Sequence, residues 1–241
     1  MANVTVISLG GSLIAPSDAA KDGAAPRRVD SAFLAEFRSC AVEYLAREER
    51  RKLILVCGGG SLARDYQGAF REVAGAAPSE ELDWIGIAAT RLNGELVRRI
   101  FRQWCIEDLI MDPTAVSVFA GRVMVAAGWK PGFSTDYDAV VLAQRFSADT
   151  IINMSNIAKV YTDDPKKNKE AKPIDAMSWK QFTQIVGDEW VPGKNAPFDP
   201  VAARAAAESH LRVVVTNGKD LANLRAILEG KDFIGTTIGP E

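Results

Sequence analysis

Short apolar runs alternate along this chain with longer segments in which apolar residues recur every three or four positions. The runs predict strands at 4–9, 53–57, 116–119, 123–126, 150–154, 212–216 and 233–238. The periodic segments predict helices at about 31–45, 80–104, 136–146, 178–186, 201–209 and 221–228, and another after Ser61. Such alternation is typical of parallel sheets covered by helices on both faces. We therefore expect an α/β fold, a three-layer sandwich with a largely parallel central sheet, formed by one domain over 1–241.

The residues between these segments indicate where elements begin and end. Asp30 or Ser31 suits the start of a helix, and the basic cluster at 50–52 suits its end, where cations complement the helix dipole. Gly121-Arg122 suits a hairpin turn. Residues 155–173 are predicted to form one long polar loop, 233–238 an edge strand, and His210 a helix C-terminus.

Composition and charge exclude several classes of protein. The net charge of −2 gives no reason to expect nucleic acid or an anionic membrane as a partner. No apolar run approaches the length of a membrane span, and no basic segment precedes the first apolar run, so we expect a cytoplasmic protein without a signal peptide. Cys40, Cys57 and Cys105 form no disulfide or zinc pattern and are expected to be buried thiols. A single histidine, His210, leaves little room for catalytic triads or histidine-metal clusters.

Glycine-rich turns follow several of the predicted strands. The run 53–57 leads into Gly58-Gly59-Gly60-Ser61, and the first strand leads into Gly10-Gly11-Ser12. Glycines let backbone N–H groups approach an anion closely, Ser61 can cap the helix that follows, and Arg64 can bind a phosphate with its guanidinium group. Taken alone, one such loop is equally well explained as a tight turn without a ligand.

Similar turns at 128–135 and 155–156 strengthen the case, because ligands gather at the carboxyl ends of strands in open α/β sheets. Together these turns would surround a polyanion with N–H and hydroxyl groups, although no Walker A motif is present. Phosphoryl transfer depends on positioning and charge neutralisation, and an ionised phosphate acceptor requires no general base. A chain with one histidine and several phosphate-type loops fits that chemistry.

The motifs and their order resemble the amino acid kinase superfamily, most closely its archaeal-type uridylate (UMP) kinase branch. The matching segments are 10–12, 58–64, 83–86, 131–136, 160–167 and 198–203. The resemblance implies ATP and Mg²⁺ as cofactors, UMP as acceptor, an acceptor-binding part over about 1–147 and an ATP-binding part over about 148–241. It also implies a homo-oligomer, with a hexamer as the expected assembly.

The resemblance assigns a role to each matching residue. Those implied to bind ATP are Gly10, Gly11, Ser12, Gly60, Arg64, Ser155, Tyr161 and Asp164. Those implied to bind UMP are Gly59, Asp83, Gly128 and Thr135. Asp136 would organise the reacting phosphates or magnesium, and no resident metal site is expected. From the residues alone, Asp83 is also explained as an exposed residue in the first turn of a helix, and Asp136 as the N-cap or first-turn acid of its helix.

The chain departs from the family pattern at two places. Many members carry a lysine where this chain has Ser8, placed to neutralise the transferring phosphoryl group. Here Lys194 or Lys130 would have to supply that positive charge, and the Gly-Lys-Asn loop favours Lys194. Ala158 and Lys159 replace the usual acid and glycine before Val160.

Other functions remain open from the sequence. One is a kinase of the same fold with another small phosphate or carboxylate as acceptor. Another is a nucleotide- or oxyanion-binding storage or regulatory protein without turnover. A third is an NAD-dependent oxidoreductase, because 58–63 fits a dinucleotide fingerprint and Asp83 follows 20 residues later, although that acid is predicted to lie on a helix rather than at a strand end.

Overall fold

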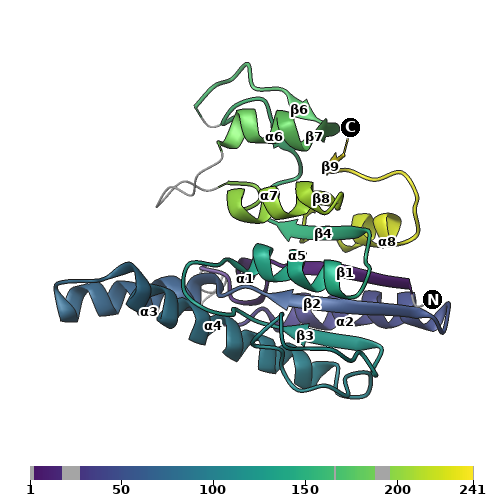
Figure 1. Cartoon of the computed structure of the whole chain (residues 1–241), viewed down its shortest axis with the longest axis horizontal. Helices are drawn as coiled ribbons and strands as arrows, with labels where there is room; N and C mark the ends of the chain where they lie inside the picture. The colour runs from purple at the N-terminus through teal and green to yellow at the C-terminus, as the bar shows by residue number, and fades with distance from the viewer. Residues whose placement is uncertain (1–2, 18–27, 166, 188–195, 241) are drawn as a thin grey trace.

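The computed structural model describes residues 3–17, 28–165, 167–187 and 196–240 (Figure 1). Within these ranges a seven-stranded sheet has the order β3-β2-β1-β4-β8-β9-β7. Its strands are β1 (Asn3–Leu9), β2 (Arg51–Cys57), β3 (Val123–Ala126), β4 (Thr150–Ser155), β7 (Ala176–Ser178), β8 (Arg212–Asn217) and β9 (Thr236–Gly239). Neighbours pair in parallel except β8 and β9, which are antiparallel. The predicted largely parallel sheet is confirmed.

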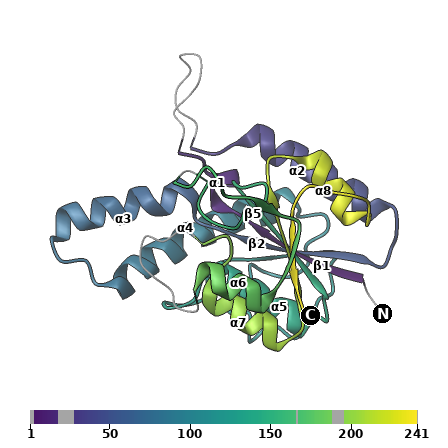
Figure 2. The same cartoon turned by 90° about the horizontal axis from the view of Figure 1, so that it is seen from above.

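Helices cover both faces of this sheet. Helices α2 (Ser31–Ala46) and α8 (Leu221–Leu228) lie on one face, and α5 (Thr135–Arg145), α6 (Trp179–Val186) and α7 (Pro200–Glu208) lie on the other (Figure 2). The short helix α1 (Gly11–Ile14) follows β1. Helices α3 (Gly60–Ala74) and α4 (Ser79–Ile100) pack together, and α3 extends well beyond the sheet (Figure 1). The three-layer sandwich is therefore the observed architecture.

The central strands contribute side chains to both hydrophobic cores, because successive side chains of a strand point to opposite faces of the sheet. In β2, Ile54 and Val56 belong to the core under α5, α6 and α7, whereas Leu53, Leu55 and Cys57 belong to the core under α2 and α8. All five side chains are fully buried. A continuous apolar run is what a strand covered on both faces requires.

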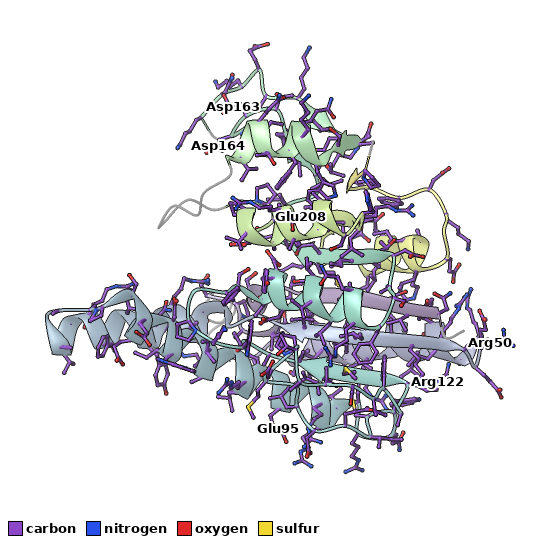
Figure 3. All side chains as sticks on the ribbon, in the orientation of Figure 1. Arg50, Glu95, Arg122, Asp163, Asp164 and Glu208 are labelled. Carbon is purple, nitrogen blue, oxygen red and sulfur yellow. The ribbon has the colours of Figure 1, made fainter. Side chains whose placement is uncertain are left out.

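The basic cluster at 50–52 was predicted to end a helix, and this is wrong for two of its residues. Arg51 and Lys52 begin β2, while α2 ends at Ala46. Arg122 (Figure 3) explains the boundary, because its guanidinium group donates to the carbonyls of Leu45 and Arg51, at 2.5 and 3.2 Å. An arginine distant in sequence therefore satisfies the carbonyls at the end of α2 and the start of β2.

The strand predicted at 116–119 does not form. Side chains bind its backbone carbonyls instead: Arg145 donates to Val116, and Lys52 donates to Phe119. The Phe119 ring packs edge-on against Phe146, with centroids 5.6 Å apart. Without this strand, Gly121 and Arg122 form no hairpin turn, and the Arg122 N–H donates to the Trp104 carbonyl.

The C-terminal strand also differs from its prediction as an edge. Strand β9 begins only at Thr236 and lies between β8 and β7, because the short segment 176–178 pairs with it in parallel. The predicted long loop at 155–173 contains β5 (Val160–Tyr161), which pairs with β6 (Pro173–Ile174). Thr236 connects the two regions, because its hydroxyl accepts from the Val160 N–H and donates to the Ile174 carbonyl.

The remaining expectations concern His210, the three cysteines and membrane-spanning helices. His210 follows the end of α7 with a left-handed backbone (φ 55°), as a helix C-terminus allows. Cys40 and Cys57 are buried, Cys105 is partly buried, and all three are free thiols. None of the described helices combines the length and apolar character needed to cross a bilayer.

Candidate active site

The glycine and hydroxyl turns lie along one edge of the sheet. Strands β1, β2, β3, β4 and β8 are parallel, so the turns that follow them share the carboxyl edge. Backbone hydrogen bonds join adjacent turns: the Gly10 N–H donates to the Met154 carbonyl (3.1 Å) and the Gly58 N–H to the Leu9 carbonyl (3.0 Å). The predicted clustering of these turns is thus observed.

The first two glycine turns touch each other through their backbones. A Cβ atom on Gly11 would lie 2.0 Å from the Gly60 nitrogen, and one on Gly60 would lie 2.2 Å from the Gly11 carbonyl oxygen. Gly60 also has a φ of +66°, which glycine adopts without strain. Glycines at both positions therefore let the starts of α1 and α3 lie side by side. N–H groups at the start of a helix that lack a partner favour an anion there.

The prediction that Ser61 caps α3 is wrong. Ser61 instead holds the two turns together. Its hydroxyl donates to the Pro16 carbonyl (2.9 Å), and its N–H donates to the Ala15 carbonyl (2.9 Å). The position before α3 belongs to Gly59, which has no side chain to offer. The hydroxyl and N–H of Ser61 therefore bind the segment after α1 and not the start of α3.

Asp136 lies at the start of α5, beside the end of β1. Its Oδ1 accepts from the Ser8 hydroxyl (3.1 Å), and its Oδ2 accepts from the Asp199 N–H (3.2 Å). Burial raises the pKa of Asp136 to about 6, and the two hydrogen bonds only partly offset this shift. The carboxyl group is thus held in one orientation from β1 and from the start of α7, at the edge where the glycine turns meet.

The turn at 128–134 joins β3 to α5 and is held from α4. The Gly128 N–H donates to the Thr90 hydroxyl (2.8 Å), and Arg91 donates to the carbonyls of Gly128 (3.3 Å) and Trp129 (2.9 Å). Asp83, at the start of α4, accepts from the Gly132 N–H (2.9 Å). The sequence-predicted residues Asp83 and Gly128 are therefore brought together in one loop arrangement.

Aromatic side chains cover this turn. The Trp129 and Phe133 ring centroids are 5.1 Å apart, and those of Phe133 and Tyr137 are 4.6 Å apart. The ammonium of Lys130 lies 3.9 Å from the Trp129 ring centroid, a cation–π arrangement. Lys130, considered above as a source of positive charge, is thus held over this aromatic cluster.

Comparison with known proteins decides the family. The model of the amino acid kinase family matches residues 3–217. The chain belongs to the amino acid kinase family. A uridylate kinase of Thermoplasma volcanium is 32% identical over 238 residues, covering 97% of this chain and 96% of that protein. One from Methanothrix thermoacetophila is 33% identical over 232 residues, covering 94% and 96%. The crystal structure of uridylate kinase from Archaeoglobus fulgidus matches with a TM-score of 0.79 and 31% identity, covering 98% of this chain and 99% of that one.

The remaining sequence-predicted residues of this amino acid kinase lie in several different elements of the fold. Ser12 lies in α1, and Ser155 ends β4, where its hydroxyl accepts from the Ile157 N–H (3.3 Å). Tyr161 lies in the separate β5–β6 pair, and Asp164 lies at the periphery of the view in Figure 3, with a carboxylate oxygen 3.9 Å from the Lys167 ammonium. Arg64 is exposed on the first turns of α3. Lys194 lies outside the described residues.

Several residues of this edge were not predicted from the sequence. The buried Asn93 donates to the carbonyls of Gly58 (2.8 Å) and Gly59 (3.2 Å), and the buried Asn153 donates to the Pro197 carbonyl (2.8 Å). Thr90 and Asn93 lie on the buried face of α4, where the helical pattern calls for apolar residues. Polar residues at such positions were the available signal, because buried polar groups require partners.

The oxidoreductase interpretation finds no support in this arrangement. Its fingerprint requires an acid at the end of the strand after the glycine helix. Asp83 lies instead within α4, which follows α3 directly. The carboxylate therefore faces the 128–134 turn, where it accepts from the Gly132 N–H.

Proposed function

We propose that this protein transfers the γ-phosphoryl group of ATP to UMP, giving ADP and UDP. An ionised oxygen of the UMP phosphate forms the new bond to the γ-phosphorus, and the bond to the bridging oxygen breaks with its electron pair leaving on ADP. No proton has to be removed from the acceptor. The backbone contact between the Gly11 and Gly60 turns, beside Asp136, is the observation that carries this proposal. Relatives that cover nearly the whole chain and are named uridylate kinases support it.

The proposed roles follow the two parts of the chain. Residues from about 1 to 147 would bind the acceptor and contribute the turns that meet the ATP phosphates, and residues from about 148 to 241 would bind the rest of ATP. The ATP-binding residues are proposed to be Gly10, Gly11, Ser12, Gly60, Arg64, Ser155, Tyr161 and Asp164. The UMP-binding residues are proposed to be Gly59, Asp83, Gly128 and Thr135. For Gly128 the proposed role is close packing, because its N–H and carbonyl are already bound by Thr90 and Arg91.

Asp136 is the proposed organiser of the reacting phosphates. Mg²⁺ is usually held by substrate phosphates and only one or two carboxylates, and it relieves repulsion between phosphates when bound. A carboxylate fixed by Ser8 and Asp199 at the strand ends fits that demand. Among the described residues, no group of three or more potential ligands could by itself hold a metal ion. Lys194 is the proposed source of positive charge in place of the lysine that many members carry at position 8.

A coupled assay of ADP release tests the function. We expect turnover with ATP, Mg²⁺ and UMP to exceed that with CMP, AMP, isopentenyl phosphate, glutamate or carbamate by at least about tenfold, since hydrogen-bonded sites reject poorly matched substrates. This result would also show that Ser8 is compatible with activity. Faster turnover of another acceptor would support the proposed kinase activity but contradict UMP as its substrate. Binding of nucleotide or oxyanion without turnover would favour the storage or regulatory interpretation.

We propose further that the chain forms a homo-oligomer, with a hexamer as the expected assembly. Helix α4 exposes Leu92 (63%) and Leu96 (36%), one turn apart, and burying such side chains against another copy is favourable. Light scattering should give about six times the 26.1 kDa chain mass. Leu92→Glu should lower that mass, whereas Val118→Glu, at a similarly exposed position (62%), should leave it unchanged. A single-chain mass for the unmodified protein would contradict this proposal.

A further inference from the structure

We propose that Asp138 is a positioning residue that holds the amide of Trp129 and so presets the 128–134 turn. The link to catalysis rests on the proposed function, which assigns this turn to the acceptor. Asp138 lies in the first turn of α5, two residues after Asp136, and its side chain is fully buried. None of the roles assigned above involves this residue.

The contacts of Gly128 and Trp129 show how the turn is held. The Trp129 N–H donates to Oδ2 of Asp138 (3.2 Å), and the Trp129 carbonyl accepts from Arg91 (2.9 Å). The Gly128 N–H donates to Thr90, and the Gly128 carbonyl accepts from Arg91. Side chains from α4 and α5 therefore bind every backbone N–H and carbonyl of these two residues. Asp138 is the member of this clamp that comes from α5.

Asp138 and Asp136 serve different sides of the same helix turn. Residues two positions apart on a helix do not face each other. Asp136 faces Ser8 and the Asp199 N–H, whereas Asp138 faces the Trp129 N–H. The first turn of α5 thus connects the carboxylate beside the glycine turns to the start of the 128–134 turn. A shift of one relative to the other would break one of these hydrogen bonds.

Packing alone does not account for an aspartate at this position. Its second oxygen, Oδ1, is buried and has no hydrogen-bond partner among the residues that the structure describes. The next residues of α5, Ala139 and Val140, are fully buried and apolar. An apolar side chain here would avoid the cost of a buried, partly unsatisfied carboxyl group. A residue that is unfavourable for packing is expected at a functional site when it has a compensating role. Here that role is the hydrogen bond to the Trp129 N–H.

The test compares Asp138→Leu, which has a similar shape and no acceptor, with Asp138→Asn, which keeps an acceptor oxygen. In the full-length protein, Asp138→Leu should raise KM for UMP about tenfold, since losing a buried hydrogen bond has an effect of that order. KM for ATP should change less than about twofold, because the clamp touches only the acceptor turn. Asp138→Asn should restore most of the affinity for UMP. Val140→Ala, a buried change in the same helix, is the control for general destabilisation and should leave both KM values unchanged.

Hydrogen exchange provides a measurement that does not depend on turnover. Deuterium uptake in peptides spanning 127–134 should be at least about tenfold faster in Asp138→Leu and close to that of the unmodified protein in Asp138→Asn. If Asp138→Leu does not fold, Asp138→Ala removes the same acceptor and replaces it in both measurements. Unchanged exchange and unchanged KM for UMP in a folded variant lacking the acceptor would overturn the proposal. Faster exchange in a protein that turns over no UMP would support the positioning role and reject the proposed function.

Discussion

Gly11→Ala is expected to lower kcat/KM for UMP by at least about 100-fold and to destabilise the protein by about 1–3 kcal/mol. The added Cβ would lie 2.0 Å from the Gly60 nitrogen and 2.5 Å from the Gly58 carbonyl carbon. Both neighbours are backbone atoms, so no side chain can rotate away and the two turns must separate. Steady-state kinetics and urea unfolding would measure the two effects.

Gly68→Ala is the matched control for this substitution. Gly68 lies in α3, and a Cβ there would have no other atom within 4 Å. Alanine should therefore leave kcat/KM unchanged and raise the free energy of unfolding by roughly 0.5–1 kcal/mol, because glycine is unfavourable inside a helix. If Gly11→Ala behaved like Gly68→Ala, the contact between the two turns would not be needed for activity.

Asp136→Asn is expected to reduce kcat by roughly 100- to 1,000-fold while making the folded protein more stable at pH 8. The loss follows from removing the negative charge that the proposed function places beside the reacting phosphates. Asparagine retains the shape and an oxygen that can accept from Ser8 or Asp199. Opposite changes in activity and stability distinguish a functional carboxylate from a structural one.

The direction of the stability change follows from the pKa of Asp136. Burial raises that pKa from 3.8 to about 6, so the folded protein binds this proton more tightly than the unfolded chain. The stabilising contribution is full below pH 4 and is lost as the pH rises through about 6. At pH 8, Asp136→Asn should therefore raise the free energy of unfolding by about 1–3 kcal/mol, and at pH 4 the difference should be small. Equal stability at both pH values, measured by urea unfolding, would contradict this prediction.

As the pH rises, the free energy of unfolding of the unmodified protein should fall over a wider pH range than the titration of Asp136 alone would produce. Burial, together with the nearby charges of Asp136 and Asp112, raises the pKa of Asp138 to about 7, although the Trp129 N–H and Arg91 oppose the shift. The same sign applies, so its contribution is lost as the pH rises from about 4 to about 7. Two buried carboxyl groups on one helix turn lower the stability of the protein, as is common where a site must hold functional groups in fixed positions.

The apolar pattern was sufficient to predict most of the sheet and its layers. Strand β2 is an unbroken apolar run because both of its faces are covered, and that property is visible in the residues themselves. The glycine turns were also visible, because only glycine suits the close approach between Gly11 and Gly60. Their gathering along one edge followed from parallel strands alone.

The failures arise where distant residues decide the local structure. The segment at 116–119 has the composition of a strand, yet Arg145 and Lys52 bind its carbonyls. Strand β7 has three residues and no distinctive pattern, and only its pairing with β9 makes it a strand. Hydrogen bonds between segments far apart in the sequence leave no local periodicity to detect.

The sequence by itself determined the fold class, the family and the positions of the phosphate-type turns, since each depends on local pattern and residue type. Only the tertiary structure decided which side chains hold those turns in place. Asn93 binding the Gly58 carbonyl, Asp199 donating to Asp136, and Asp138 accepting from Trp129 each join separate elements. A buried polar group is stable only where its partner lies, and partners are brought together by packing rather than by sequence spacing.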